Sequence, residues 1–129
     1  MNTTVTPILS VRQPWAWMII HGGKDIENRR WHTKVRGPVL IHASGGCTRQ
    51  EYYEASGFAF LAIGGGIWDN YPEFEDLQRG GIVGQVEVVD CVSESDSPWF
   101  VGPYGFVLRK PVVLPWRPMR GKLGFFEAS

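Results

Sequence analysis

Cysteine is scarce in this sequence: Cys47 and Cys91 are the only two among 129 residues. They lie far apart, and no second pair stands near either one, so the ligand spacing typical of a zinc site is absent. With no signal peptide ahead of them, both are expected to be free thiols in the reducing cytoplasm. The sequence therefore predicts no metal site, and it indicates no cofactor.

Long hydrophobic runs are also lacking. The apolar run at residues 15–20 is far too short to span a bilayer, which needs about 20 residues. The glycines at 64–66 are not followed by the Lys and Ser/Thr of a phosphate-binding loop. Neither a membrane-spanning protein nor a protein with that nucleotide-binding loop is expected.

Net charge is absent as well, since 13 Lys and Arg balance 13 Asp and Glu. The charges are nevertheless unevenly distributed along the chain. Residues 9–50 hold seven basic and two acidic residues, residues 51–96 hold one basic and ten acidic, and residues 97–129 hold five basic and one acidic. We expect the two ends to build one basic face that can recruit an anion. The alternative is that these charges interleave in space and cancel.

Short strands separated by glycine and proline are what the chain does have. Its length suits one domain over residues 8–129, preceded by a flexible arm at residues 1–7. Alternating and β-branched runs predict extended segments at 8–11, 24–30, 39–43, 82–92, 104–109 continuing through 112–114, and 123–127. About six strands and two early helices predict an α+β, mainly β fold: a small, partly closed β-barrel with helices packed at its ends.

Two helices are predicted in the first half of the chain. Pro14 is placed at the first position of one, which is apolar nearly all round, so that its Trp15 is expected in the core. The glycines at 22–23 end this helix. Thr48 and Glu51 form the capping box of the second helix, which is expected to break near Gly57. The following residues supply four core candidates: Phe58, Phe60, Leu61 and Ile63.

The residues best suited to chemistry lie between 9 and 44. Alternation along 24–30 puts Glu27 and Arg29 on the same side of the extended segment, where they can form an ion pair. Lys24 is either a solvated lysine at the negative end of the helix dipole or a functional one, which holds a phosphate as a point charge or, if desolvated, acts as a base or nucleophile. A partnership between Lys24 and Glu27 would need a bend in the segment.

Further candidates surround this segment. Arg12 and Gln13 lead into the first helix, and Trp31 follows in a polar loop where it can stack on a base. Ser44 is either a turn residue or a donor to phosphate, and His42 on the same strand is more often a structural group than a base. Residues 117–122 are expected to form a basic turn. Three residues of the C-terminal half can line the same cleft or form a surface turn: Tyr104, Arg117 and Arg120.

Several motifs together resemble the ASCH (activating signal cointegrator homology) domain family. They are QPWA at 13–16, GGKDIENRRW at 22–31, RGPVLIHAS at 36–44, GGIVGQVEVVDCV at 80–92 and PWFVGPYGFVL at 98–108. The core pattern of the family, Gly-x-Lys-x-x-Glu-x-Arg, is met in full by Gly22, Lys24, Glu27 and Arg29. The resemblance covers roughly residues 8–126.

The resemblance implies a PUA-like β-barrel with a cleft beside the Gly-x-Lys motif that binds RNA or another nucleic acid. It also admits an enzyme, because some members are ribonucleases or hydrolyse an acetylated cytidine. The catalytic residues of that amidohydrolase branch are a Lys, a Thr three residues later and a later Glu. Here Lys24 matches the Lys, Glu27 stands in place of the Thr, and Glu87 is a candidate for the later Glu.

Three hypotheses follow. The first is a nucleic-acid-binding module for RNA or a single strand, with these candidate contacts: Arg12, Gln13, Lys24, Arg29, Trp31, Ser44 and Tyr104. The second is a small RNA- or nucleoside-directed hydrolase that uses Lys24 and Glu27 as an acid/base pair. The third is a protein-interaction domain that presents its acidic middle segment, with Glu73, Glu75 and Asp76 as contacts.

Overall fold

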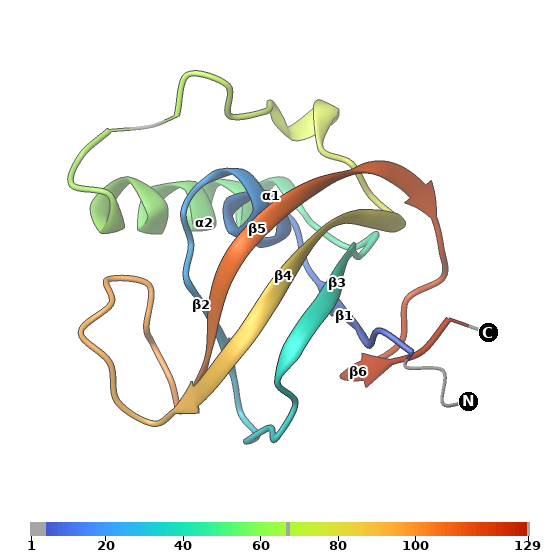
Figure 1. Ribbon diagram of the computed structural model, residues 1–129. Helices are drawn as coiled ribbons and strands as arrows, with labels where there is room; N and C mark the ends of the chain where they lie inside the picture. The colour runs from blue at the N-terminus through green and yellow to red at the C-terminus, as the bar shows by residue number, and fades with distance from the viewer. Residues whose placement is uncertain (1–4, 67, 129) are drawn as a thin grey trace.

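A single six-stranded sheet that curls into a half-barrel is the main feature of the computed structural model, which describes residues 5–66 and 68–128 (Figure 1). The strands are β1 (Ile8–Val11), β2 (Ile26–Arg29), β3 (Gly37–Ala43), β4 (Gly81–Val92), β5 (Tyr104–Pro118) and β6 (Phe125–Phe126). Their order in the sheet is β2-β5-β4-β3-β1-β6, and every neighbouring pair is antiparallel except β1 and β3. The predicted mainly β, PUA-like class is confirmed.

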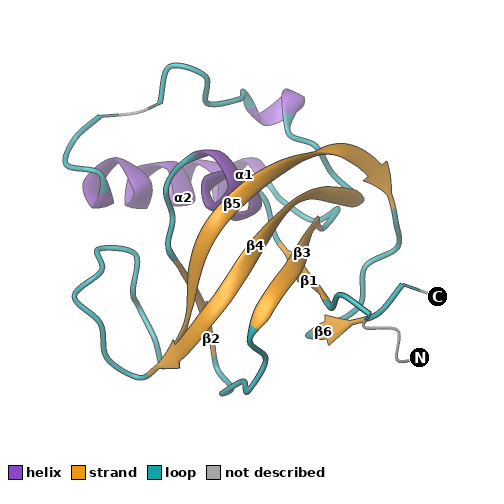
Figure 2. Ribbon diagram, in the orientation of Figure 1, coloured by secondary structure: helices purple, strands orange, loops and turns teal. Residues whose placement is uncertain are grey.

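Two α-helices gather at one end of the sheet (Figure 2). Helix α1 (Trp15–His21) connects β1 to β2, and α2 (Arg49–Ala62) follows β3. A short 3-10 helix, η1 (Phe74–Asp76), precedes β4. None of the helices in the described part of the chain is long and apolar enough to cross a membrane.

Helix α1 is buried on two sides, as its apolar sequence predicts. Its Ile19 and Ile20 belong to the main core with the inward-facing residues of β1, β3, β4 and β5. Its Met18 faces the other way and packs in a second cluster with Ala59 of α2 and with Trp99. Helix α1 thus lies between the sheet and α2, and packing on both sides fixes the position of the turn that follows α1.

The second helix differs from the prediction. It runs without a break through Gly57, where an added Cβ would meet no atom within 4 Å, so the glycine is a solvent-facing position rather than a helix end. Phe60 and Leu61 are 46% and 78% exposed, so placing them in the core was wrong. Because the buried residues of α2 are Tyr52, Ala55 and Ala59, only one face of this helix is covered, and Phe60 and Leu61 lie off it.

The strand bounds also differ in detail. Strand β5 is continuous from Tyr104 to Pro118, so the basic turn expected to start at Arg117 begins later, and β6 is only two residues long. Residues 1–4 of the expected N-terminal arm lie outside the described residues. Pro7, at the end of that arm, accepts a hydrogen bond from the Leu40 backbone N–H (2.9 Å), which ties the arm to β3.

Candidate nucleic-acid interface

The turn after α1 places the lysine of the Gly-x-Lys pattern. The backbone N–H groups of Gly22 and Lys24 both donate to the Met18 carbonyl oxygen, at 2.9 and 3.0 Å. Gly23 between them has φ +77°, a left-handed conformation that favours glycine. The chain therefore reverses tightly, and Lys24 enters the protein with only 4% of its surface exposed. The solvated lysine considered from the sequence is excluded, and the bend required for a Lys24–Glu27 contact is present.

One buried carboxylate holds two cations at this point. The Lys24 Nζ donates to Glu27 Oε1 at 3.2 Å and also to the Ile26 carbonyl oxygen. The Arg29 Nε donates to the other oxygen, Oε2, at 3.0 Å, and its Nη2 donates to the Ser10 carbonyl oxygen at 2.8 Å. The ion pair expected between Glu27 and Arg29 is thus present, and β2 and β1 are linked through it.

Burial changes the chemistry of the lysine. Loss of hydration lowers the pKa of Lys24, and the attraction and hydrogen bond of Glu27 oppose this shift, while the nearby Arg29 charge adds to it. The amine therefore gives up its proton more readily than a solvated lysine does, which is the property that a general base requires.

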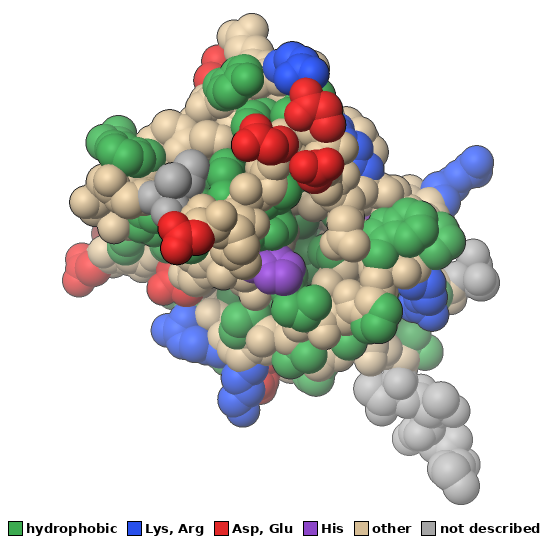
Figure 3. Space-filling view, turned by 90° about the horizontal axis from the view of Figure 1, so that it is seen from above, with side chains coloured by type: hydrophobic (Ala, Val, Ile, Leu, Met, Phe, Trp, Pro, Cys, Tyr) green, Lys and Arg blue, Asp and Glu red, His purple; other side chains and the backbone are tan. Residues whose placement is uncertain are grey.

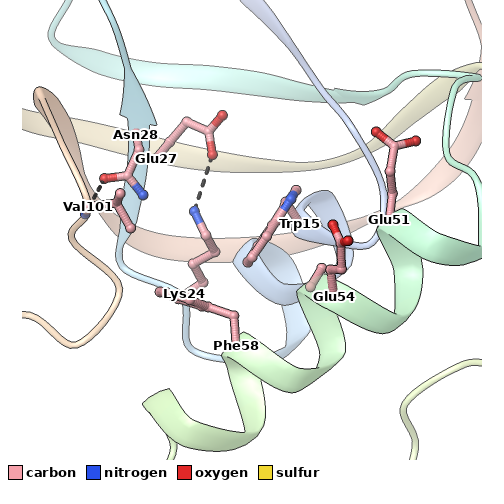
Figure 4. Close-up of a pocket in the computed structure, with 9 residues that line it drawn as sticks. Trp15, Lys24, Glu27, Asn28, Glu51, Glu54, Phe58 and Val101 are labelled. Atoms are coloured by element: carbon pink, nitrogen blue, oxygen red, sulfur yellow. Dashed lines mark hydrogen bonds and ion pairs between the residues drawn. The ribbon is translucent and has the colours of Figure 1, made fainter.

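A pocket of about 430 Å³ opens above this cluster, and we call it the acidic pocket (Figure 4). Its lining comes from α1, the turn after it, β2, α2 and the loop before β5: Trp15, Lys24, Glu27, Asn28, Glu51, Glu54, Ala55, Phe58 and Val101. Figure 4 shows the Lys24 amine pointing at Glu27, with Trp15 between this pair and the two glutamates of α2. The Lys24 Nζ lies 5.5 Å from the centroid of the Trp15 ring, within the range of a cation–π contact.

A second depression, the basic trough, adjoins the acidic pocket and shares Trp15, Glu27 and Asn28 with it. Its volume is about 470 Å³. The charged side chains along it are those of Arg12, Arg29, Lys122 and Glu27. Three of these four are cations, so the sign of the charge reverses between the acidic pocket and the trough.

A third depression, the C-terminal pocket, continues from the trough. The two share Ser10, Ser44, Lys122 and Leu123, and the C-terminal pocket adds His42 and Arg120 within a volume of about 410 Å³. Together the three spaces form one groove that runs from α2 across β1 and β2 to the segment between β5 and β6.

Two hydroxyl groups and one imidazole line the end of this groove. The Met119 carbonyl oxygen lies 2.6 Å from His42 Nε2 and can only accept, so Nε2 carries the hydrogen and Nδ1 accepts from the Ser10 hydroxyl at 2.9 Å. His42 is therefore a structural group that anchors the C-terminal segment to β1 and β3. The buried Ser44 Oγ, in contrast, has no hydrogen-bond partner among the described residues.

Ion pairs redistribute the charges that are segregated along the sequence. Four pairs join a base from the two basic ends to an acid from the acidic middle: Arg12–Glu51, Arg36–Asp90, Arg49–Glu75 and Lys110–Glu87. Figure 3 shows the result on one face, where acidic and basic side chains lie among each other and neither sign covers the surface. Arg120 and Lys122 form no salt bridge within the described ranges, so they are the uncompensated cations of the groove.

Four of the seven predicted binding residues come together at the groove: Arg12, Lys24, Arg29 and Ser44. Gln13 does not line it; its amide is occupied at both ends, donating to the Gln78 carbonyl oxygen (2.8 Å) and accepting from the Trp17 N–H (3.0 Å). Trp31 is 39% exposed but packs edge-on against Phe106, and Tyr104 contacts His32; neither lines the groove.

Sequence reasoning missed several residues of the site. Trp15 was expected in the core, yet it lines two of the three depressions. Lys122 was part of a recognised basic turn, but nothing in the sequence showed that this turn meets β1. The helical spacing of Glu51, Glu54 and Phe58 places them on one side of α2. The sequence does not show which part of the protein that side faces, so this spacing alone could not assign them to the site.

The carboxylate proposed as a later catalytic glutamate lies elsewhere. Glu87 is on β4 and pairs with Lys110 at 3.5 Å, and it does not line the acidic pocket. Glu73, Glu75 and Asp76 are exposed, and Glu75 pairs with Arg49 at 2.6 Å. A protein partner at these three residues stays a prediction.

The curled six-stranded sheet, with a helix between β1 and β2 and a groove beside the Gly-x-Lys turn, defines a PUA-like domain. The family model of the ASCH domain matches residues 9–100, and the chain belongs to that family. It is 32% identical to human Activating signal cointegrator 1 over 121 residues, covering 81% of this chain, and 34% identical to the mouse protein of that name over 87 residues, covering 67%. The matches span only 20% and 14% of those relatives.

Proposed function

We propose that this domain binds single-stranded nucleic acid, RNA above all, along the groove. The observation that carries the proposal is the continuity of the basic trough with the C-terminal pocket, which places Arg12, Arg29, Lys122 and Arg120 along one path. Basic side chains spaced along a groove are the usual means of holding a phosphate backbone. The family resemblance, which implies nucleic-acid binding beside the Gly-x-Lys motif, supports the same assignment.

Two further features support this proposal. Ser44 lines the groove between the cations, and its buried hydroxyl has no hydrogen-bond partner among the described residues, so rotation of this side chain would offer the hydroxyl to a phosphate oxygen. Trp15 and Phe58 supply aromatic surface at the acidic end, where a base turned away from the backbone can stack. The backbone would then follow the cations while one base enters the acidic pocket.

Binding of a short, fluorescently labelled single-stranded RNA tests the proposal. The Arg120→Ala/Lys122→Ala variant should bind about tenfold more weakly, a loss of ~1.4 kcal/mol, because both uncompensated cations are removed. The Lys34→Ala/Lys110→Ala variant removes the same charge away from the groove and should bind like the unaltered protein. Equal affinity of the two variants would contradict the proposed path.

One observation favours hydrolysis as a second candidate function. The Lys24 amine and the Glu27 carboxylate are in contact, and burial lowers the pKa of Lys24, as a general base requires. Turnover of an N-acylated nucleoside that Lys24→Met abolishes, with an unchanged circular dichroism spectrum, would support it. Absence of turnover by the unaltered protein would contradict the hydrolase and leave nucleic-acid binding as the remaining candidate function.

A further inference from the structure

The polar groups of the acidic pocket are unsuited to phosphate. Three carboxylates line it, those of Glu27, Glu51 and Glu54, against the single amine of Lys24. That amine is directed at the Ile26 carbonyl oxygen, at Glu27 and at the Trp15 ring, so its hydrogen-bonding capacity is already used. A phosphate group placed here would meet carboxylates and gain no cation in return.

The carboxylates differ in how much hydrogen-bonding capacity they keep. Glu27 is shared by two cations, and Glu51 is held by Arg12 and by the Thr48 N–H of the helix cap. The Glu54 carboxylate accepts from the Gln50 side chain at Oε1 (3.0 Å), and its Oε2 has no partner among the described residues. Glu54 is therefore the acceptor most available to a molecule in the pocket.

The side-chain donors are, by contrast, few. The Asn28 amide nitrogen donates to the Trp99 carbonyl oxygen at 3.0 Å, and its oxygen accepts from the N–H groups of Val101 and Gly102. Asn28 thus shapes the wall of the pocket without offering a free group. An occupant of the pocket must supply hydrogens to the acceptors and a flat apolar surface to Trp15 and Phe58.

From these contacts we propose that the acidic pocket selects adenine or cytosine rather than guanine or uracil, by the amino group at C6 of adenine or C4 of cytosine, and that Glu54 accepts a hydrogen from this group. The inference rests on the proposed function, since the basic trough must hold the strand whose base enters the pocket. At the position of this amino group uracil presents its O4 carbonyl oxygen and guanine its O6 carbonyl oxygen, and a carboxylate repels both. The reversal of charge between pocket and trough keeps the phosphates outside.

Strands that differ only in the amino group test the inference. We expect the protein to bind an adenine strand about tenfold more tightly than the same strand with purine, in which hydrogen replaces the amino group. The protein should likewise bind a cytosine strand more tightly than a uracil strand, by a similar factor. The Glu54→Gln variant should lose most of both preferences, and Glu94→Gln, which makes the same charge change in the exposed loop after β4, should keep them.

The outcomes separate the two proposals. Equal affinity for all four strands would overturn the base preference and still support binding along the groove. Preferences that Glu54→Gln leaves intact would overturn the role of the acidic pocket. Failure to bind any strand would contradict the proposed function, and the inference with it. An oligolysine peptide that binds to the unaltered protein and not to Glu54→Gln, without any base preference, would assign the pocket to a basic protein segment.

Discussion

Glu27 is the centre of the buried charge cluster beside the groove. Its carboxylate is buried with Lys24 on one oxygen and Arg29 on the other, and all three belong to the pattern Gly-x-Lys-x-x-Glu-x-Arg. Charges removed from water are tolerated only when they are paired and hydrogen-bonded. The spacing of this pattern therefore places a buried cluster of ion pairs, and the groove lies above this cluster.

Replacement of this carboxylate should be costly. Glu27→Gln leaves the buried Lys24 and the partly buried Arg29 without this counterion and is expected to destabilise the fold by about 3–5 kcal/mol. Lys24→Met should cost less, because Arg29 still neutralises Glu27 and the methionine fills most of the lysine volume. Urea unfolding at neutral pH measures both changes.

The exposed Glu54→Gln is the matched control for Glu27→Gln, and it should stay within about 0.5 kcal/mol of the unaltered protein. A smaller loss for Glu27→Gln than for Lys24→Met would mean that the carboxylate is not the centre of the cluster.

At the scale of elements, α2 carries the acidic wall of the pocket, and its start is fixed by a capping box. The Thr48 hydroxyl accepts from the Glu51 N–H at 3.1 Å, and the Glu51 carboxylate accepts from the Thr48 N–H at 2.9 Å. The same carboxylate pairs with Arg12 at the mouth of the basic trough. The cap therefore links the first turn of α2 to the groove.

Loss of the cap should weaken the helix start. Thr48→Ala is expected to cost about 1 kcal/mol of stability, and amide hydrogen exchange should become faster in the first turn of α2. Thr48→Ser keeps the hydroxyl and should behave like the unaltered protein in both measurements. Unchanged exchange in Thr48→Ala would show that tertiary contacts alone hold this turn.

Two tyrosines fasten α2 to the segment that precedes η1. The rings of Tyr52 and Tyr71 stack at 5.5 Å, the Tyr71 hydroxyl lies 2.7 Å from Ser56 Oγ, and the Tyr52 hydroxyl donates to the Pro72 carbonyl oxygen. Burial raises the pKa of Tyr71 above its ordinary value of 10.0, against a smaller opposing effect of the Ser56 hydrogen bond. Burial also raises the pKa of Tyr52.

This shift predicts a loss of stability in alkali. Below pH 10 the Tyr71 phenol is neutral in both the folded and the unfolded chain, so its contribution is intact. As the pH rises above 10, the unfolded chain ionises first, and the free energy of unfolding falls. Urea unfolding between pH 9 and pH 11 should show this decline, and Tyr71→Phe should flatten it. An equally steep decline in Tyr71→Phe would assign the effect to other groups.

At the scale of the whole molecule, ion pairs across the fold neutralise part of the segregated charge, and cations from both ends of the chain remain along the groove: Arg12, Arg29, Arg120 and Lys122. The four pairs between the ends and the middle of the chain neutralise cations that the sequence left in excess. What remains at the groove is a local gradient, from the carboxylates beside α2 to Arg120 and Lys122. A neutral protein can therefore still orient a strand.

This arrangement predicts the salt dependence of binding. On a single strand each phosphate contact adds about 0.7 to the magnitude of the slope of log K against log salt concentration. Loss of Arg120 and Lys122 together should therefore reduce that slope by about 1.4. Glu54→Gln should leave the slope unchanged, because in the proposed binding mode the acidic pocket holds a base and no phosphate. Equal slopes for the Arg120→Ala/Lys122→Ala variant and the unaltered protein would show that the phosphate backbone of the strand does not contact these two cations.

The sequence by itself determined the local elements and the inward faces of the strands. Alternation along the segment predicted at 39–43 places Val39, Ile41 and Ala43 on one face of β3, and all three are fully buried. The capping box at Thr48 and the glycines after α1 likewise marked helix ends that the structure contains. These features depend on neighbours within a few residues, so a linear pattern specifies them.

Only the tertiary structure decided what the charged and aromatic residues do. The burial of Lys24 requires the turn after α1 to be held between the sheet and α2. Lys122 lines the same depression as Ser44 only because β6 pairs with β1. The ion pairs between Arg12 and Glu51 or Arg49 and Glu75 likewise join residues distant in sequence. Contacts of this kind depend on how the elements pack. Neither the charge of a residue nor the periodicity of its segment identifies a contact partner that is distant in the sequence.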